Sequence, residues 1–164
     1  MFRLRTGGVL AVVALLAEAT LAGIPTMELA SASTDRVSGS VKFEIVSTNA
    51  QGTNDTVAAT GAIHAQGSDK EGERKDVFKF PDGNLVIQHK TTEGSTHESF
   101  DPVTCQFKFT EKGTWKVGKN STGAYTAAKG SGTYRATGTG FGCDENTEPS
   151  PFYVHVKAKG KICY

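Results

Sequence analysis

The sequence lacks the short motifs that identify most enzyme classes and metal proteins. It has no C-x-x-C pair, no G-x-S-x-G nucleophile elbow and no phosphate-binding P-loop. Four histidines are present, yet none is spaced as H-x-H, H-x-x-x-H or H-E-x-x-H. The glycine-rich run Gly138–Gly142 follows a strand pattern and opens no helix, so it is no dinucleotide fingerprint. We therefore assign no catalytic residue, no metal ligand and no cofactor from the sequence.

Neither sign of charge is in excess. The chain has 18 Lys and Arg against 17 Asp and Glu, and its formal net charge is +1. No run of lysines forms an obvious stripe, so we expect no binding to nucleic acid or to an anionic membrane through bulk electrostatics. The acidic segment Asp144–Asn146 lacks the spacing of a calcium loop and is interpreted as a solvated rim.

No hydrophobic run is long enough to span a bilayer. The clearest, Val9–Leu16, follows two arginines and leads to an A-x-A site at Ala30–Ala32. This pattern predicts a signal peptide over residues 1–32 and a secreted domain at residues 33–164, with no membrane attachment after cleavage. The alternative is an uncleaved N-terminal anchor. A mature chain of this length forms one domain with a single core.

Cysteine is scarce, and its three positions limit the disulfide pattern. In an exported protein one pair is expected to be oxidised. We favour Cys105–Cys143, because both stand at strand ends that flank a glycine-rich block. Cys163 would lie a whole strand away from Cys143 if the last strand pairs antiparallel with the one before it. A free Cys163 makes a disulfide-linked dimer conceivable, and the oligomeric state is left open.

Residues 33–164 show strand alternation and no helical period. Ser38–Ser47 is a clear case, with Val41, Phe43 and Ile45 on one face and charged residues on the other. The strands we predict span residues 38–47, 57–65, 76–80, 84–90, 104–110, 114–117, 123–127, 132–141 and 151–161, with 91–99 as an edge strand or a loop. Loops or turns are predicted at residues 48–56, 66–73, 111–113, 118–121, 129–131 and 144–151.

Bulky residues alternate with Thr and Gly between Gly113 and Gly142. Large side chains alternating with very small ones suit a tightly curved sheet whose interior tapers. Strands that recur with turn signals about every ten residues indicate a sandwich or a barrel. The glycine content favours the barrel, because sharp coiling of a sheet needs it. We predict an all-β fold, a single antiparallel β-barrel of about eight strands.

The segment Pro81–Gly83 is the strongest local turn signal. Proline presets one backbone angle and glycine accepts a positive φ. A two-residue Asp-Gly loop places Phe78 and Phe80 on the face of Leu85 and Ile87, whereas a three-residue loop would flip one strand. We adopt the two-residue loop because it joins the aromatic side chains to the aliphatic ones.

Ser121–Tyr125 followed by Gly130–Tyr134 resembles the glycine-rich hairpin of the allene oxide cyclase barrel-like and dirigent-like families. Gly113–Trp115 and Phe80–Leu85 are similar to segments of small exported actinobacterial members of that group. The resemblance covers roughly Val57–Phe141 and implies an eight-stranded barrel with a central cavity. It carries over no catalytic residue.

The candidate ligand site is the barrel interior. His89 alternates with Leu85 and Ile87 and is therefore a candidate to point inward as a hydrogen-bond donor or acid/base group; the alternative is a half-solvated histidine at a strand end. The aromatic side chains either line a cavity or simply fill the core. The aromatic candidates are Phe43, Phe78, Phe80, Phe107, Phe109 and Trp115.

Two functions from different classes follow from this reading. The first is a secreted, non-enzymatic barrel that binds a small hydrophobic molecule or a partner surface. The second is a cyclase- or isomerase-like enzyme, which rests on the resemblance and needs an ionisable group facing the cavity. Its candidate groups are Glu44, Glu98 and His89, although Glu44 alternates outward. A domain that merely coats a cell surface is a third possibility.

Overall fold

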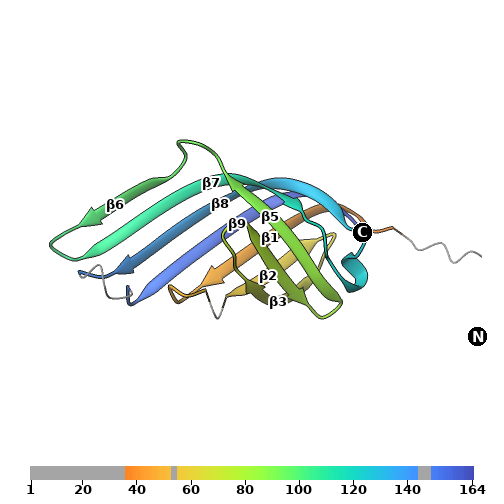
Figure 1. The fold of residues 1–164 in the computed structure, drawn as a ribbon, viewed down its shortest axis with the longest axis horizontal. Helices are drawn as coiled ribbons and strands as arrows, with labels where there is room; N and C mark the ends of the chain where they lie inside the picture. The colour runs from red at the N-terminus through yellow and green to blue at the C-terminus, as the bar shows by residue number, and fades with distance from the viewer. Residues whose placement is uncertain (1–35, 53–54, 144–148) are drawn as a thin grey trace, which may run out of the picture. The chain divides into compact units, whose positions relative to one another are not determined.

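The computed structural model describes residues 36–52, 55–143 and 149–164 (Figure 1). The predicted signal peptide and the acidic segment 144–146 lie outside these ranges. Within them, no helix has the length and apolar character needed to cross a bilayer. The described chain is all-β, with nine strands and one 3₁₀ turn.

The strands form one antiparallel sheet that closes on itself. The chain runs through β1 (Ser38–Ser47), β2 (Thr56–Gly61), β3 (Ala65–Lys70), β4 (Lys75–Phe80), β5 (Gly83–Thr91), β6 (His97–Asp101), β7 (Gln106–Val117), the 3₁₀ turn η1 (Gly123–Tyr125), β8 (Lys129–Phe141) and β9 (Phe152–Cys163).

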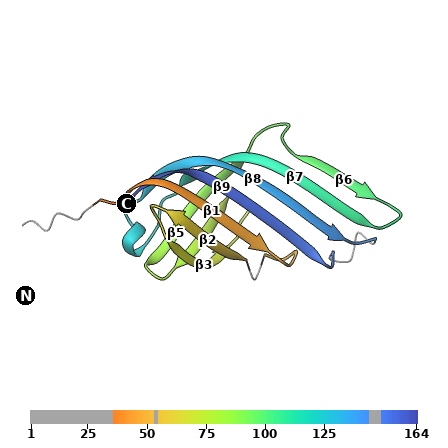
Figure 2. The same cartoon turned by 180° about the vertical axis from the view of Figure 1, so that it is seen from behind.

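The order of the strands is β5-β4-β3-β2-β1-β9-β8-β7-β6, and an additional pairing of β5 with β7 closes the barrel. Eight strands form the barrel, while β6 lies outside it and pairs only with the first half of β7. Figure 2 shows β1, β9, β8 and β7 side by side from behind. The predicted eight-stranded antiparallel barrel is confirmed.

Strand β3 occupies a segment that we predict to be a loop, residues 66–73. The predicted strand 57–65 ends earlier, at Gly61, where φ is +99° and an added Cβ would collide with the Ser40 carbonyl. Strand β3 then runs to Lys70. The loop prediction is wrong for residues 66–70, because the buried face of β3 carries Gly67 and Asp69 in place of apolar side chains, and it holds for residues 71–73. The polar composition of β3 leads us to predict a loop, although this strand has a carboxylate, Asp69, at a buried position.

The predicted turn at residues 111–113 is also wrong, because β7 continues through it. Glu111 points into the barrel and accepts a hydrogen bond from the Tyr134 hydroxyl at 2.6 Å, so its charge does not mark a loop. Gly113 lies directly opposite Tyr134 in the register, where a side chain would collide with the tyrosine ring. The predicted turn at residues 129–131 likewise belongs to β8.

Residues 123–127 form no strand. They contain η1, whose Tyr125 is buried and packs against Phe80 and Tyr164. The loop is held to β5 by two side chains: Val86 N–H donates to Ser121 Oγ at 3.0 Å, and Asn84 N–H donates to Thr122 Oγ1 at 3.1 Å. The turn therefore plugs one end of the barrel.

The β4–β5 hairpin has the predicted faces with a different loop. Phe80 pairs with Gly83, so the two loop residues are Pro81 and Asp82 in place of Asp82 and Gly83. The register shifts by two residues, which keeps the same faces together, since side chains alternate with period two. Phe78 pairs with Leu85, and both are buried as expected.

The predicted disulfide is confirmed. Cys105 lies just before β7 and Cys143 just after β8, with their Cα atoms 4.9 Å apart. Cys163 pairs with Lys129 in the β8–β9 register, at the opposite end of β8, and carries a free thiol. The bridge therefore ties the start of β7 to the end of β8.

Candidate functional site

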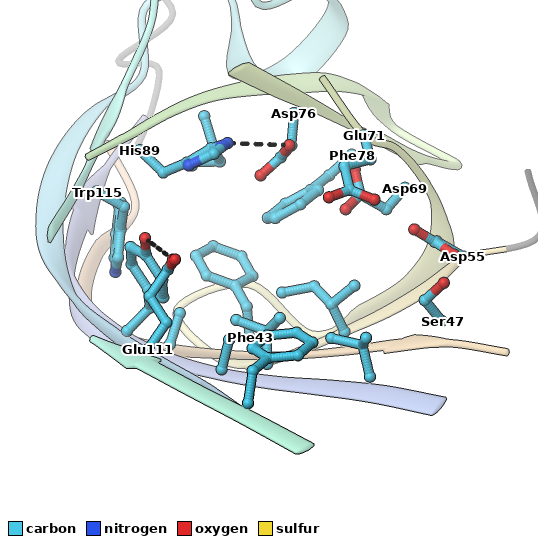
Figure 3. Close-up of a pocket in the computed structure, with 18 of the residues that line it drawn as sticks. Phe43, Ser47, Asp55, Asp69, Glu71, Asp76, Phe78, His89, Glu111 and Trp115 are labelled. Atoms are coloured by element: carbon cyan, nitrogen blue, oxygen red, sulfur yellow. Dashed lines mark hydrogen bonds and ion pairs between the residues drawn. The ribbon is translucent and has the colours of Figure 1, made fainter. Parts of the chain in front are cut away.

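A cavity of about 360 Å³ lies inside the barrel, at the end away from η1. Its floor is apolar, and its wall toward β3 and β4 is acidic (Figure 3). The apolar lining consists of Phe43, Ile45, Ala50, Phe78, Ile87, Phe109, Trp115, Ala136, Phe152, Val154, Val156 and Ala158. A hollow of this size suits one small ligand.

Five of the seven predicted cavity residues line this space. Phe43, Phe78 and Trp115 form its aromatic base, with ring centroids 5.2 Å apart between Phe43 and Phe78 and 5.5 Å apart between Phe43 and Trp115. His89 and Phe109 lie on its wall. The structure thus brings together side chains from β1, β4, β5 and β7.

Phe80 and Phe107 lie elsewhere. Phe80 is buried at the plugged end, where it packs edge-on against Tyr125. Phe107 packs beside Phe152 and over Gly140, outside the cavity lining. Both side chains lie on the inner face of their strands, as the alternation predicts. The barrel interior extends beyond the cavity, so a side chain on the inner face does not necessarily line the cavity.

Five carboxylates line the cavity, and the sequence reading identified none of them. Asp55 precedes β2, Asp69 lies in β3, Glu71 follows β3, Asp76 lies in β4 and Glu111 in β7. Figure 3 shows Asp69, Glu71 and Asp76 on one wall, with Glu111 beside Trp115 on the opposite wall. No lysine or arginine is among the described lining residues. The cavity is therefore strongly acidic.

Asp55 and Asp69 are deeply buried, with 3% and 8% of their surface exposed. The backbone links them, because Asp69 N–H donates to the Asp55 carbonyl oxygen at 2.9 Å. One side-chain oxygen of each, Oδ1, is buried and makes no hydrogen bond. A buried carboxylate oxygen without a donor is energetically costly.

Burial, followed by the neighbouring charges of Asp76, Asp55 and Glu71, raises the pKa of Asp69 from 3.8 to about 8, although His89 opposes the shift. Near neutral pH, Asp69 is therefore largely protonated. The pKa of Glu71 is also raised, first by burial and then by Asp55 and Asp76. A carboxylic acid that keeps its proton at neutral pH can donate a hydrogen bond or a proton inside the cavity.

His89 forms an ion pair with Asp76. Its Nε2 lies 3.4 Å from Asp76 Oδ1 and 3.2 Å from the Gly72 carbonyl oxygen. The hydrogen bond to Asp76 raises the pKa of His89, although burial opposes this. The same Oδ1 atom of Asp76 also accepts a hydrogen bond from the Gly72 N–H, at 3.4 Å. These contacts hold the imidazole ring at the edge of the cavity.

On the opposite wall, Glu111 bonds to a tyrosine. The Tyr134 hydroxyl donates to Glu111 Oε1, and Thr91 Oγ1 lies 3.2 Å from the same hydroxyl. Burial and the bond to Glu111 raise the pKa of Tyr134 to about 12, so the phenol stays protonated. Glu111 therefore has a fixed donor, unlike the Oδ1 atoms of Asp55 and Asp69.

Two of the three ionisable groups proposed for an enzyme do not face the cavity. Glu44 is exposed on the outer face of β1, and Glu98 is exposed on β6. The acidic wall is not predicted from the sequence, because the near-neutral net charge of the chain gives no sign that acidic and basic side chains lie on opposite faces of the strands. Acidic side chains gather inside, while lysines on the barrel strands point outward and are exposed. Exposed examples are Lys42, Lys79, Lys112, Lys116, Lys157 and Lys159.

One signal in the sequence did point to the acidic wall. Asp69 and Asp76 stand at inward positions of short strands, two residues from Gly67 and Phe78 respectively. Strict alternation along β4 would have placed Asp76 on the face of Phe78.

The described residues contain no cluster of three or more His, Cys, Asp or Glu side chains arranged to hold a metal ion.

Comparisons of the chain with protein-family models, with curated proteins and with solved structures found no match. The resemblance to the allene oxide cyclase barrel-like group is thus neither supported nor contradicted. The chemistry of the site is argued from its own geometry: a barrel cavity with an aromatic base and an acidic wall.

Proposed function

We propose that this protein is exported and binds a small, mainly apolar molecule inside its barrel. The observation that carries the proposal is the cavity of about 360 Å³ over the base formed by Phe43, Phe78 and Trp115. One end of the barrel is plugged by η1, so a ligand would contact the lining on several sides. The disulfide Cys105–Cys143 is compatible with an extracellular location.

The cavity is larger than a packing defect in a filled core. Tyr125, Leu85 and Val41 fill the plugged half of the barrel with almost no exposed surface, so the chain is able to fill an interior where it needs to. In the other half the inward positions of β8 after Tyr134 hold Ala136, Gly138 and Gly140, and the rings of Phe109 and Phe107 cover the two glycines. The small side chain of Ala136 leaves space open in the cavity that it lines.

Native mass spectrometry of the protein taken from the medium of its producing cells tests the proposal. We expect a reproducible mass excess that is lost on denaturation, on a chain that begins at Ser33. A chain without any mass excess, together with failure to bind apolar probes, would contradict the proposal.

A cavity-filling variant gives a sharper prediction. Ala136 is buried and faces the cavity, so Ala136→Phe should fill part of the space and weaken binding of the retained molecule by about tenfold or more. The matched control is Thr133→Phe, which adds the same ring to the exposed outer face of β8. Titration of each apo variant with the extracted molecule measures the effect. Equal affinity in both variants would place the ligand elsewhere.

A cyclase- or isomerase-like enzyme is a second candidate, favoured by Asp69. A carboxyl group that is protonated near neutral pH and faces an apolar cavity has the properties of a general acid, and the His89–Asp76 pair lies on the same wall. The test is conversion of the bound molecule. An enzyme would lose turnover in Asp69→Asn while still binding the molecule, and a binding protein would show no conversion in either form.

A further inference from the structure

The acidic wall presents two buried oxygens that are not needed to hold the fold. Oδ1 of Asp55 and Oδ1 of Asp69 have no hydrogen-bond donor, and both side chains are more than nine-tenths buried. Two other pairs of polar groups in the cavity are engaged with each other, His89 with Asp76 and Tyr134 with Glu111, while Glu71 is exposed. Among the described lining residues, the two Oδ1 atoms are therefore the buried acceptors that have no donor.

No described lining residue donates to either Oδ1 atom, so the donor is either the proton that Asp69 itself retains or a group of a bound molecule that replaces this proton. No lysine or arginine is among the lining residues described, and Ser47 Oγ donates to the Asn49 carbonyl oxygen at 3.0 Å. His89 donates toward Gly72 and Asp76. Figure 3 shows the Asp55 and Asp69 side chains on the cavity wall, with Phe78 beside Asp69. Asp69 and Phe78 are direct partners in the β3–β4 register.

We infer that the ligand of this cavity is a small primary amine with an apolar body, whose ammonium group binds Asp55 and Asp69 while its body packs on Phe43, Phe78 and Trp115. The inference rests on the proposed function and specifies its ligand class. An ammonium group has three donors and no acceptor, which matches carboxylate oxygens that lack donors. Charge-assisted bonds of this kind are about twice as strong as neutral ones.

The distribution of charge favours an organic cation over an anion or a neutral molecule. The lining holds five carboxyl groups against a single histidine, which pairs with Asp76, so an anionic ligand would meet net repulsion even while Asp69 is protonated. A neutral molecule would leave both Oδ1 atoms without a strong donor. The described residues offer no cluster arranged for a metal ion.

Binding of an ammonium ion should be coupled to loss of a proton. Asp69 is faced by Asp55 from just before β2, by Glu71 from just after β3, by Asp76 from β4 and by His89 from β5. The pKa of about 8 for Asp69 reflects burial among these groups. A bound cation would favour its ionised form, so proton release should accompany binding near pH 7. A neutral ligand should release no proton.

The experiment uses three probes that share one apolar body: 4-phenylbutylamine, 4-phenylbutanol and 4-phenylbutyrate. Their phenyl rings leave the fluorescence of Trp115, the single tryptophan of the chain, free to report binding. We expect the amine to bind about tenfold or more tightly than the alcohol, and the carboxylate to bind least. Calorimetry in buffers of different ionisation enthalpy should record proton release for the amine alone.

Two substitutions test whether the preference for the amine over the alcohol comes from the acidic wall of the cavity. Asp69→Asn and Asp55→Asn should each reduce amine affinity to near that of the alcohol, and should change alcohol affinity much less than amine affinity. The control is Glu98→Gln, which removes an exposed carboxylate on β6 and should change neither. Circular dichroism of each variant checks that the barrel is retained.

The outcomes separate this inference from the proposed function. Equal binding of amine and alcohol, or amine binding that survives both Asp variants, would overturn the amine inference and leave the cavity as a binding site. Binding of none of the probes up to about 1 mM, with no retained molecule in the native protein, would overturn both. A calcium-dependent rise in melting temperature that the amine does not produce would point to a metal ion and would also overturn the inference.

Discussion

The free energy of unfolding should fall by about 3–4 kcal/mol between pH 5 and pH 8, with Asp69 as the main cause. Its pKa is about 8 in the folded protein and 3.8 without the fold. Between these values the folded state holds a proton that the unfolded state has lost. Each pKa unit corresponds to about 1.4 kcal/mol, so stability declines as pH rises through this window.

The direction follows from the sign of the shift. A raised carboxyl pKa gives a contribution that is fully present below the unfolded value and is lost as pH rises through the folded value. Glu71 and His89 also have raised pKa values, so their contributions fall in the same direction. Above about pH 8 the contribution of Asp69 is exhausted, and the curve should flatten.

Denaturant unfolding of the disulfide-intact protein from pH 5 to pH 9 measures the effect. In Asp69→Asn the slope should shrink to the part that Glu71 and His89 supply, because an amide does not titrate. The comparison of slopes is unaffected by any constant cost of the substitution. Glu98→Gln, at an exposed position, should keep the slope of the wild type. A wild-type stability that stayed level or rose across this window would contradict the burial of Asp69 in a low-dielectric wall.

The pattern of apolar residues was enough to predict the barrel, but not its polar interior. Strands β1, β4 and β9 carry apolar side chains at alternate positions, and their faces came out as expected. Strand β3 and the middle of β7 carry Asp69 and Glu111 at inward positions, and there the same rule predicted a loop and a turn. Alternation reports burial only when the buried residue is apolar.

The candidate site shows the same division. The aromatic residues of the cavity base were predictable, because an aromatic ring at an inward position of a barrel strand must lie in the barrel interior. The acidic wall depends on how the start of β2, the end of β3 and the start of β4 meet at one end of the barrel. Alternation can place Asp69 and Asp76 inward, but no local pattern brings these strand ends together. Phe80 and Phe107 were assigned to the cavity for a related reason: alternation gives the face of a strand and not the height along the barrel.

In the glycine-rich strands, Trp115 packs on two glycines. From the sequence, these glycines indicate only a narrowing of the barrel interior. Trp115 on β7 lies opposite Gly132 on β8, which in turn lies opposite Gly160 on β9. The indole ring covers both glycines, and Trp115 Nε1–H donates to the Lys159 carbonyl oxygen at 3.3 Å. Glycine is therefore the surface on which the central ring of the cavity packs, a use known from sheets in which an aromatic residue covers a cross-strand glycine.

Replacing this glycine should have the largest effect on folding. In Gly132→Ala the new Cβ would overlap the Lys159 carbonyl oxygen and lie 2.7 Å from Trp115 Nε1, on the hydrogen bond between them. Either the ring must leave its position or the β8–β9 ladder must open. We expect a loss of about 3 kcal/mol or more, because both backbone and ring are displaced. Denaturant unfolding measures the loss, and the emission of Trp115 should shift toward that of an exposed indole.

The same substitution at Gly39 is the matched control. Gly39 lies in β1 opposite Ile162, and a Cβ there would meet only the Ala62 Cβ, at 3.5 Å, an ordinary contact. Gly39→Ala adds the same atom to the same barrel and should change stability by less than about 1 kcal/mol. If Gly132→Ala were tolerated equally well, with Trp115 emission unchanged, the close approach of ring and backbone would be wrong. The aromatic base of the cavity would then need a different arrangement, and the proposed packing of a ligand on Trp115 would fall with it.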